Sequence, residues 1–222
     1  MSSRASICGI AALAAIGSLT ASRLDAASEP DIPKILKGVE DRYSHIQTLE
    51  VKFTEKSALQ GRTRTEQGEL YLRTPGCMRW QYTAPAGKLF VSDGKFVYRY
   101  TPNDNRYERM PLQEPEDMRA PLAFLLGRIH FEEDFSEFQS TPDDADHLFI
   151  TAIPKSDKLP YTEVTFLVSP NTSTIHWLRV VCQDGSRKEF VFEREQKNPP
   201  LKDSLFKFVP LPGAEFIDSV HP

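Results

Sequence analysis

The chain has 222 residues, of which 40% are hydrophobic and 26% are charged, which is typical of one globular domain or of two small ones. Its 17 prolines argue against an all-helical bundle. The 27 lysines and arginines are outnumbered by 31 acidic residues, for a net charge of −4 without a basic block, so a polyanion such as nucleic acid is excluded as the expected partner.

The N-terminus has the pattern of a secretory signal peptide. Residues 1–4 are weakly basic, residues 7–21 form an apolar, alanine-rich run, and small residues follow Leu24 near a plausible cleavage position. An uncleaved membrane anchor is the alternative, but the run is shorter than the roughly 20 residues that a membrane span needs. We expect residues 1–26 to be a signal peptide, cleaved near residue 26, and residues 27–222 to form a single exported domain.

The segments that follow change from helical to strand periodicity. Apolar residues spaced three or four apart over residues 31–46, with Asp31 as a candidate N-cap, predict an amphipathic helix. Alternation of apolar and polar residues then predicts strands at residues 51–54, 70–72 and 78–82. Two apolar runs around Asp93-Gly94, over residues 89–100, predict a β-hairpin.

The second half of the chain begins with an interruption of this pattern. Prolines at positions 111, 115 and 121 precede a compact apolar run, and we expect a short helix over residues 121–128. Strand character resumes at residues 147–152, 161–168, 175–182, 186–192 and 205–209. Gln183-Asp184-Gly185 predicts a second hairpin turn. About ten strands with mostly hairpin-length connections exclude a parallel, doubly wound sheet.

Several of these strands are apolar on both faces, so something must cover the second face. Within residues 96–100, Phe96, Tyr98 and Tyr100 share one face while Val97 lies on the other. Either two sheets stack as a sandwich, or one curved sheet wraps around the two apolar helices. The second arrangement leaves a concave apolar interior.

Motifs of catalysis or metal binding are missing from the sequence. None of the five histidines is spaced from another as zinc ligands are, and neither a phosphate-binding loop nor a nucleophile elbow is present. Acidic clusters at residues 132–134 and 143–146 fit solvated loops, and a hydrolase with paired carboxylates is the alternative. We therefore expect no catalytic residue, no metal and no cofactor.

The cysteines bear on export and on anchoring. Cys8 lies in the expected signal peptide without the small residues of a lipid-attachment site, so we expect no lipid anchor. Cys77 and Cys182 remain in the exported chain. The sequence leaves open whether they form a disulfide or stay two half-buried strand cysteines, because a bridge needs Cα atoms within about 7 Å.

Two segments in the first half resemble a known family. Residues 68–85 (GELYLRTPGCMRWQYTAP) and residues 91–102 (VSDGKFVYRYTP) are similar to the LolA family of outer-membrane lipoprotein carriers. Further similar segments, in the same order and spacing, lie at residues 46–56, 120–127, 174–176 and 206–210. The resemblance covers approximately residues 31–218.

The resemblance implies a mainly β protein with some α-helix, folded as an incomplete antiparallel β-barrel. Such a barrel is a strongly curved sheet whose concave apolar face is closed by helices. It also implies a monomeric periplasmic carrier that binds the acyl chains of lipoproteins and shuttles them from an inner-membrane ABC transporter to an outer-membrane receptor. A periplasmic regulator that senses lipids or lipoproteins, and a carrier of another lipid such as a glycolipid, are the alternatives.

Two groups of lipid-contacting residues follow from this resemblance. The lid over the cavity would consist of Leu122, Phe124, Leu125 and Leu126. The wall of the cavity would consist of Met78, Trp80, Val91, Phe96, Tyr98, Phe166 and Trp177. Ordinary core packing is the alternative for each residue, because alternation shows which residues share a face but not which face is concave.

The chain departs from the family pattern at the residue before Pro75. The family has an arginine there that hydrogen-bonds the lid, whereas this chain has Thr74 at that position and Arg73 one place earlier. Adjacent strand residues point to opposite faces, so Arg73 does not replace the family's arginine unless a bulge restores its direction. We expect a lid that is held more loosely, or by another donor such as Arg79 or Arg99.

Overall fold

The computed structural model describes residues 30–112, 125 and 130–219. The chain from Asp31 onward forms one compact unit, and its main element is a single sheet with twelve strands among the described residues. The strands are β1 (Thr48–Leu59), β2 (Arg62–Arg73), β3 (Cys77–Ala84), β4 (Ala86–Asp93), β5 (Phe96–Thr101), β6 (Arg106–Pro111), β7 (Phe135–Pro142), β8 (Leu148–Pro154), β9 (Tyr161–Ser169), β10 (Thr174–Cys182), β11 (Arg187–Lys197) and β12 (Glu215–Asp218). The helical elements are α1 (Ile32–Ser44), α3 (Phe131–Asp134) and the 3₁₀ turns η1 (Pro102–Asp104) and η2 (Asp203–Phe206).

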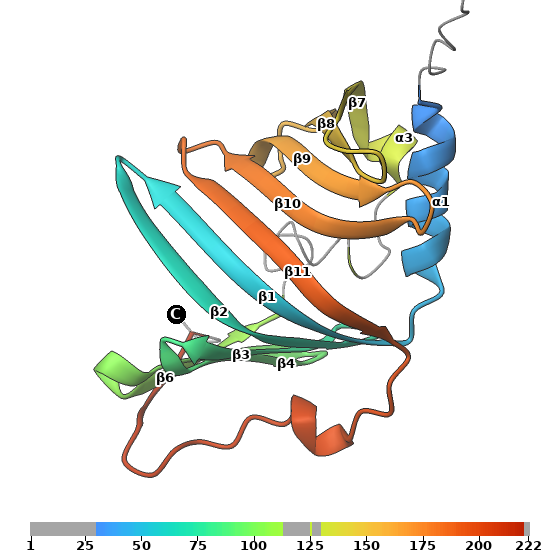
Figure 1. Cartoon of the computed structure of the whole chain (residues 1–222). Helices are drawn as coiled ribbons and strands as arrows, with labels where there is room; N and C mark the ends of the chain where they lie inside the picture. The colour runs from blue at the N-terminus through green and yellow to red at the C-terminus, as the bar shows by residue number, and fades with distance from the viewer. Residues whose placement is uncertain (1–29, 113–124, 126–129, 220–222) are drawn as a thin grey trace, which may run out of the picture. The chain divides into compact units, whose positions relative to one another are not determined.

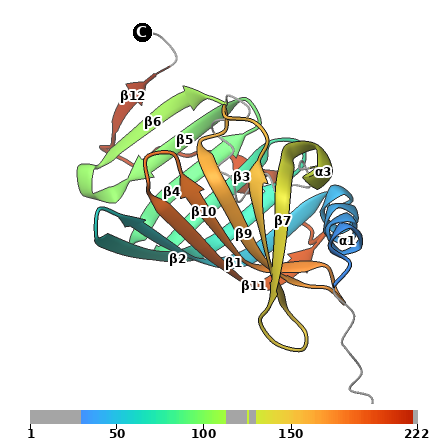
Figure 2. The same ribbon diagram turned by 90° about the horizontal axis from the view of Figure 1, so that it is seen from above.

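The strands follow one another in space in the order β12-β6-β5-β4-β3-β2-β1-β11-β10-β9-β8-β7. All neighbours are antiparallel except β12 and β6, which are parallel. The pair β1 and β11 joins distant parts of the sequence, with Phe53 opposite Phe192. The sheet is strongly curved (Figure 1) and its two edge strands, β12 and β7, lie apart (Figure 2). The expected fold class, an incomplete barrel, is confirmed.

The sheet has a concave inner face and an outer face, which strand alternation separates. The inner face carries Leu49, Val51 and Phe53 of β1, all buried. Helix α1 lies at one end of the sheet (Figure 1) and adds Leu36, Val39 and Tyr43 to the same core cluster. Asp31 caps this helix by accepting a hydrogen bond of 3.1 Å from the amide of Lys34.

The Tyr43 hydroxyl attaches the end of α1 to the sheet. It donates to Glu195 Oε2 at 2.8 Å and accepts from the amide of Ile175 at 3.1 Å. Burial together with the neighbouring Glu195 carboxylate raises the pKa of this hydroxyl. The hydroxyl therefore stays protonated and holds two strands and the helix in one network.

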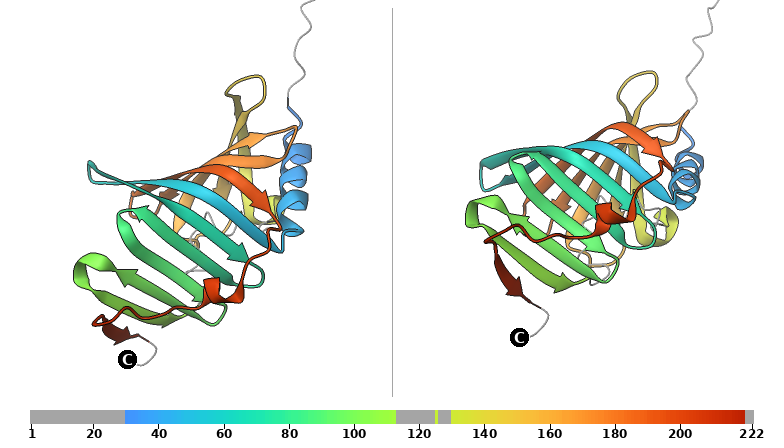
Figure 3. Two further views of the ribbon diagram at one scale, coloured as in Figure 1. Left: turned by 60° about the horizontal axis from the view of Figure 1, so that its bottom comes forward. Right: turned by 90° about the horizontal axis from the view of Figure 1, so that it is seen from below.

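The outer face of β3 to β6 is covered by the C-terminal segment, residues 198–214, which crosses it after β11 (Figure 3). Phe206 is buried, and the ring of Phe208 stacks on Tyr98 with centroids 5.1 Å apart. Residues 205–209 were expected to form a strand, and this expectation is wrong. Their apolar side chains dock on the face of the sheet instead of its edge, so their backbone does not join the ladder.

Other boundaries also differ from the expectation. Strands β6 and β7 lie in the proline-punctuated and acidic part of the chain, where alternation is weak, and were not predicted. The acidic run Glu132–Asp134 lies in α3 instead of a loop. Of the helix expected over residues 121–128, only Leu125 belongs to the described part of the chain, and it is helical.

Cys77 and Cys182 are both free, which answers the question that the sequence left open. Cys77 pairs with Arg73 on the outer face, whereas Cys182 packs against the inner core. Side chains on opposite faces of a sheet cannot bridge. Within the described residues, neither α1 nor α3 has the length and apolar character needed to cross a membrane.

Candidate functional site

The inner face is lined by aromatic rings that meet across the central strands. The ring of Phe53 contacts Trp80 edge-on with centroids 4.7 Å apart and Tyr82 with centroids 5.2 Å apart. Phe190 of β11 lies 6.0 Å from Trp80. Gly68 makes room for these rings, since a Cβ there would stand 2.9 Å from the Phe53 ring. The result is a continuous apolar surface across five strands, β11, β1, β2, β3 and β4.

Three of the seven predicted wall residues lie on this inner face. Met78, Trp80 and Phe166 are buried and belong to the core cluster. Phe166 pairs across β9 and β10 with Leu178, which in turn pairs with Phe190. The register therefore puts these three side chains on the same face of the sheet.

The other four predicted wall residues lie on the outer face. Val91 pairs with Arg79 and with Tyr98, and Phe96 has the same strand phase as Tyr98. All three lie on the side covered by the C-terminal segment. Trp177 also points outward, where its ring contacts Phe149 with centroids 5.6 Å apart. The seven residues do not form one surface, because the register puts them on both sides of one sheet.

The lid candidates fall mostly on residues outside the described part of the chain, namely Leu122, Phe124 and Leu126. Leu125 is described, is only 1% exposed, and belongs to the core cluster with Trp80 and Phe190. Its side chain therefore occupies part of the space next to the inner face.

The latch region faces away from the inner face. The Arg73 guanidinium forms an ion pair of 2.6 Å with Asp203 and lies over the ring of Phe206. Thr74 donates its amide to the carbonyl of Gln47 at 3.0 Å. No bulge turns Arg73 inward, so it holds the C-terminal segment.

The two alternative donors divide between the faces. Arg79 Nη1 donates to the carbonyl of Leu205 at 3.2 Å on the outer face. Burial lowers the pKa of this guanidinium. Arg99 is on the inner face, where it pairs with Glu108 at 2.5 Å. Of these arginines, only Arg99 is placed to contact a group that covers the inner face.

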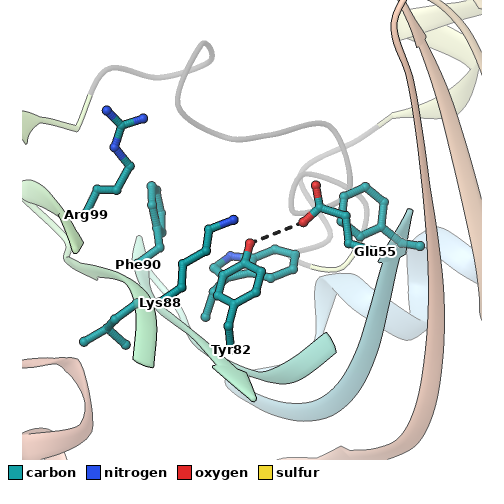
Figure 4. A pocket seen from close by; sticks show the side chains of 8 residues that line it. Glu55, Tyr82, Lys88, Phe90 and Arg99 are labelled. Atoms are coloured by element: carbon teal, nitrogen blue, oxygen red, sulfur yellow. Dashed lines mark hydrogen bonds between the residues drawn. The ribbon is translucent and has the colours of Figure 1, made fainter. Parts of the chain in front are cut away.

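A charged cluster interrupts the apolar inner face near the ends of β1, β2 and β4. Glu55 and Glu66 are each 4% exposed and lie directly opposite each other. Lys88 Nζ pairs with Glu66 at 2.6 Å and lies 4.1 Å from the centroid of the Tyr82 ring. The Tyr82 hydroxyl donates to Glu55 at 3.3 Å, as Figure 4 shows. Two buried carboxylates are thus tolerated because cations and hydroxyl groups surround them.

A small pocket lies between this cluster and the aromatic rings (Figure 4). Trp80, Phe90 and Phe190 line its apolar side, and Lys88 and Arg99 line its polar side. Its volume is about 20 Å³, enough for about one water molecule. This part of the inner face is therefore closely packed by the described side chains.

Sequence reasoning missed much of this face. Phe53, Tyr82, Phe90 and Phe190 were not named as wall residues, although they continue the phase of neighbouring buried residues. The charged cluster was also missed. A local signal was present for Glu55 alone, which follows Val51 and Phe53 at inward positions of β1. Charged residues at inward positions of a strand are the pattern to look for.

The described residues include no group of three or more histidine, cysteine, aspartate or glutamate side chains arranged to hold a metal ion. Chemically, the site offers apolar surface and a few charges. It has the means to bind and shield apolar matter, and its carboxylates are occupied in the ion pairs and hydrogen bonds described above.

Comparisons with known proteins agree with this picture. The family model "Outer membrane lipoprotein carrier protein LolA" matches residues 44–209. An outer-membrane lipoprotein carrier protein of Edwardsiella ictaluri is 25% identical over 182 residues, covering 81% of this chain and 85% of the relative. The one of Xanthomonas oryzae pv. oryzae is 26% identical over 192 residues, covering 84% of each chain. A crystal structure of an uncharacterized conserved protein from Thermus thermophilus shares the fold at a TM-score of 0.50 and 11% identity, covering 85% of this chain and 99% of that chain.

Proposed function

Because the chain belongs to the LolA family of outer membrane lipoprotein carrier proteins, we propose that it is a periplasmic carrier of lipoproteins. It binds their acyl chains on the inner face of the curved sheet. The observation that carries this proposal is the continuous aromatic surface around Phe53, Trp80 and Phe190 on the concave side. Residues 1–26 direct export, and residues 27–222 are the carrier domain, which acts as a monomer without catalysis, metal or cofactor.

The physical task of such a carrier is to hide acyl chains from water. Three chains hold on the order of 45 CH₂ groups, and at about 0.8 kcal/mol each their exposure costs roughly 35 kcal/mol. Diffusion of an unprotected lipoprotein across an aqueous space is therefore negligible. A carrier takes the lipoprotein from an inner-membrane ABC transporter and delivers it to an outer-membrane receptor.

Loading requires an exchange of apolar groups on the inner face. The space of about 20 Å³ next to Trp80 and Phe90 is far too small for an acyl chain. Leu125 packs in the same core cluster, so loading requires its side chain to move away. The other lid candidates, Leu122, Phe124 and Leu126, lie outside the described residues. Because one apolar filling replaces another, the free energies of the empty and loaded states stay close, which permits release to a receptor.

The two tryptophans provide a direct test of which face binds. Trp80 is on the inner face and Trp177 on the outer face. The variants Trp177→Phe and Trp80→Phe each keep one of them as the only fluorescent reporter. A brominated fatty acid is expected to quench Trp80 in the first variant and to leave Trp177 in the second unchanged. Quenching of Trp177 alone would contradict binding on the inner face.

The identity of the ligand is tested by mass spectrometry of protein purified gently from the periplasm. A bound triacylated lipoprotein is expected. Bound free glycolipid would indicate that the protein carries another lipid instead of lipoproteins. The absence of any apolar ligand would contradict the proposal. Outer-membrane lipoproteins that stay correctly located after depletion of the protein would also contradict it.

A further inference from the structure

The inner face changes character in rows along β11, β1 and β2. Residues in one row lie opposite one another, and successive rows are two residues, or about 7 Å, apart. The rows are first Phe192, Phe53 and Gly68, then Phe190, Glu55 and Glu66, then Lys188, Ser57 and Arg64. Arg62, opposite Leu59, continues the same phase toward the hairpin tip. Aromatic surface thus gives way to carboxylates, and the carboxylates give way to cations.

The cations outnumber the carboxylates at this end of the face. Glu66 already pairs with two of them, Arg64 at 2.6 Å and Lys88 at 2.6 Å. The side chain of Arg64 is 63% exposed despite this pairing. Among the described residues, Arg62 and Lys188 form no direct ion pair, although Lys188 is near enough to Asp184 to add to the hydrogen bonds of Ser186 in lowering the pKa of that carboxyl. An excess of positive charge is therefore concentrated at the end of the inner face of a chain whose net charge is −4.

These cations border open space instead of packed core. A groove of about 480 Å³ lies between the β1–β2 hairpin tip and the β10–β11 turn, and Arg62, Arg64 and Lys188 line it. Arg187 adds a fourth cation, and Asp184 is the carboxylate in the lining. Because Ser57, Arg64 and Lys188 line it, the groove begins two rows, or about 14 Å, from the row of Phe53.

We propose that the basic rim, defined as Arg62, Arg64, Lys88 and Lys188, binds an anionic group that the ligand carries next to its acyl chains. This inference rests on the proposed function, since it places the acyl chains on the aromatic rows. A phosphate or carboxylate that lies one or two rows from the acyl chains, or about 7–14 Å along the strands, is within reach of these cations. Arginine forks match both anions, and their position at the edge of the apolar face keeps the anion in contact with water.

The anion has two possible sources with the same chemistry. One is the phosphate of a phospholipid, and the other is an acidic side chain close to the acylated residue of a lipoprotein. The rim residues occupy inward positions on their strands, so they face a ligand bound on the inner face. A protein that docked on the outer face would instead meet the outward residues Lys52 and Lys56 of β1. Lipids and acylated peptides of defined charge separate these cases.

The experiment compares two lysophospholipids with the same acyl chain, the anionic lysophosphatidylglycerol and the zwitterionic lysophosphatidylcholine. Dissociation constants are measured by the fluorescence of Trp80 in the Trp177→Phe background. The test variant is Arg62→Gln/Lys188→Gln, which leaves the pairs of Glu66 intact. The matched control is Lys52→Gln/Lys56→Gln, which removes the same charge from exposed positions on the outer face.

We expect a preference for the anionic lipid that falls by roughly tenfold in the test variant, with affinity for the zwitterionic lipid unchanged. The control variant keeps the preference. If the test variant and the control prefer the anionic lipid equally, the inference is overturned, and binding of a protein partner becomes the explanation for these cations. If neither lipid binds to any of the proteins, the proposed function itself fails, so the two failures are distinguishable.

Acylated peptides identify the source of the anion. Two peptides share an acylated N-terminal cysteine and differ only in whether aspartate or asparagine follows it. A loss of affinity in the test variant that is confined to the aspartate peptide assigns the rim to lipoproteins. A loss that is confined to lysophosphatidylglycerol assigns it to phospholipid. Equal binding of all four ligands in both variants would contradict the basic rim.

Discussion

The two faces of the sheet are both apolar over β3 to β5, but they are covered in different ways. The C-terminal segment is fixed to the outer face by directional contacts, such as the ion pair of Arg73 with Asp203 and the stacking of Phe208 on Tyr98 with planes 3° apart. Around Trp80 on the inner face, the described contacts are mainly apolar packing and edge-on rings, and Leu125 belongs to the same core cluster. Nondirectional packing accepts a replacement of similar polarity, whereas ion pairs and stacked rings specify one partner. This contrast supports the proposal that the inner face is the one that exchanges its apolar filling for a ligand.

The largest effect is expected from removing an aromatic ring of the inner face. Trp80→Ala should lower the free energy of unfolding by about 3–5 kcal/mol, because Trp80 is buried among Phe53 and Phe190. Trp177→Ala, on the outer face, should cost less because its side chain is only half-buried. Urea denaturation followed by circular dichroism measures both. Equal losses would mean that the two faces are packed alike.

The next effect concerns the anchor of the outer cover. Phe206→Ala should cost about 1.5–3 kcal/mol, since it removes a buried ring that also lies 4.5 Å below the Arg73 guanidinium. Hydrogen exchange should speed up in residues 203–218 but not in β1 or β11. Val209→Ala, at a position that is 73% exposed, is the control. Uniform faster exchange over the whole sheet would show that the segment is an integral part of the core.

A smaller effect, of opposite sign in two variants, is expected in the charged cluster. Glu66→Gln should destabilise the protein by about 1 kcal/mol, because Lys88 and Arg64 lose a charged partner. Glu55→Gln should be neutral or stabilise it by up to about 1 kcal/mol, because it removes one of two like charges that lie opposite each other. The melting temperatures of the two single variants, measured by thermal unfolding, show whether the two stability changes have opposite signs. A loss of stability in both would mean that Glu55 is held as firmly as Glu66.

The smallest effect is a pH dependence at the end of the sheet near α1. Burial, and secondarily the neighbouring His147, lower the pKa of His176 below its ordinary 6.5, against the opposing effect of Glu195. The unfolded chain then binds a proton more readily, so this histidine's contribution to stability is complete above pH 6.5 and declines as the pH falls toward its folded pKa. His176→Gln should flatten the stability profile between pH 7 and 5, and the exposed His45→Gln should not. If the free energy of unfolding depends on pH with the same slope in His176→Gln as in the unsubstituted protein, this histidine is not a cause of the pH dependence.

Local signals in the sequence were sufficient for most of the secondary structure. Asp93-Gly94 forms the predicted hairpin, with Gly94 at φ 93° and the Asp93 carboxylate accepting from the amides of Lys95 and Phe96. Helix α1 and most strands lie where periodicity places them. The segment at residues 205–209 fails because a short apolar run has the same pattern whether it pairs at an edge or docks on a face.

The candidate site was only partly predictable for a related reason. Met78, Trp80 and Phe166 lie on the inner surface, whereas Val91, Phe96 and Tyr98 lie on the outer one. Nothing local distinguishes these two sets, since both consist of apolar residues at every second position. The charged cluster was not predicted, because Glu55 and Glu66 become neighbours only through the pairing of β1 with β2.

The amino-acid sequence by itself determined the class of the fold, the positions of most strands and the family, because these depend on local periodicity and on the order of short motifs. Tertiary structure decided which face is concave, which arginines serve the C-terminal segment, and that Cys77 and Cys182 stay apart. It also placed Lys188, Ser57 and Arg64 in one row on three strands. The physical reason is that curvature, register and coverage arise from contacts between segments far apart in the chain, and no single segment contains them.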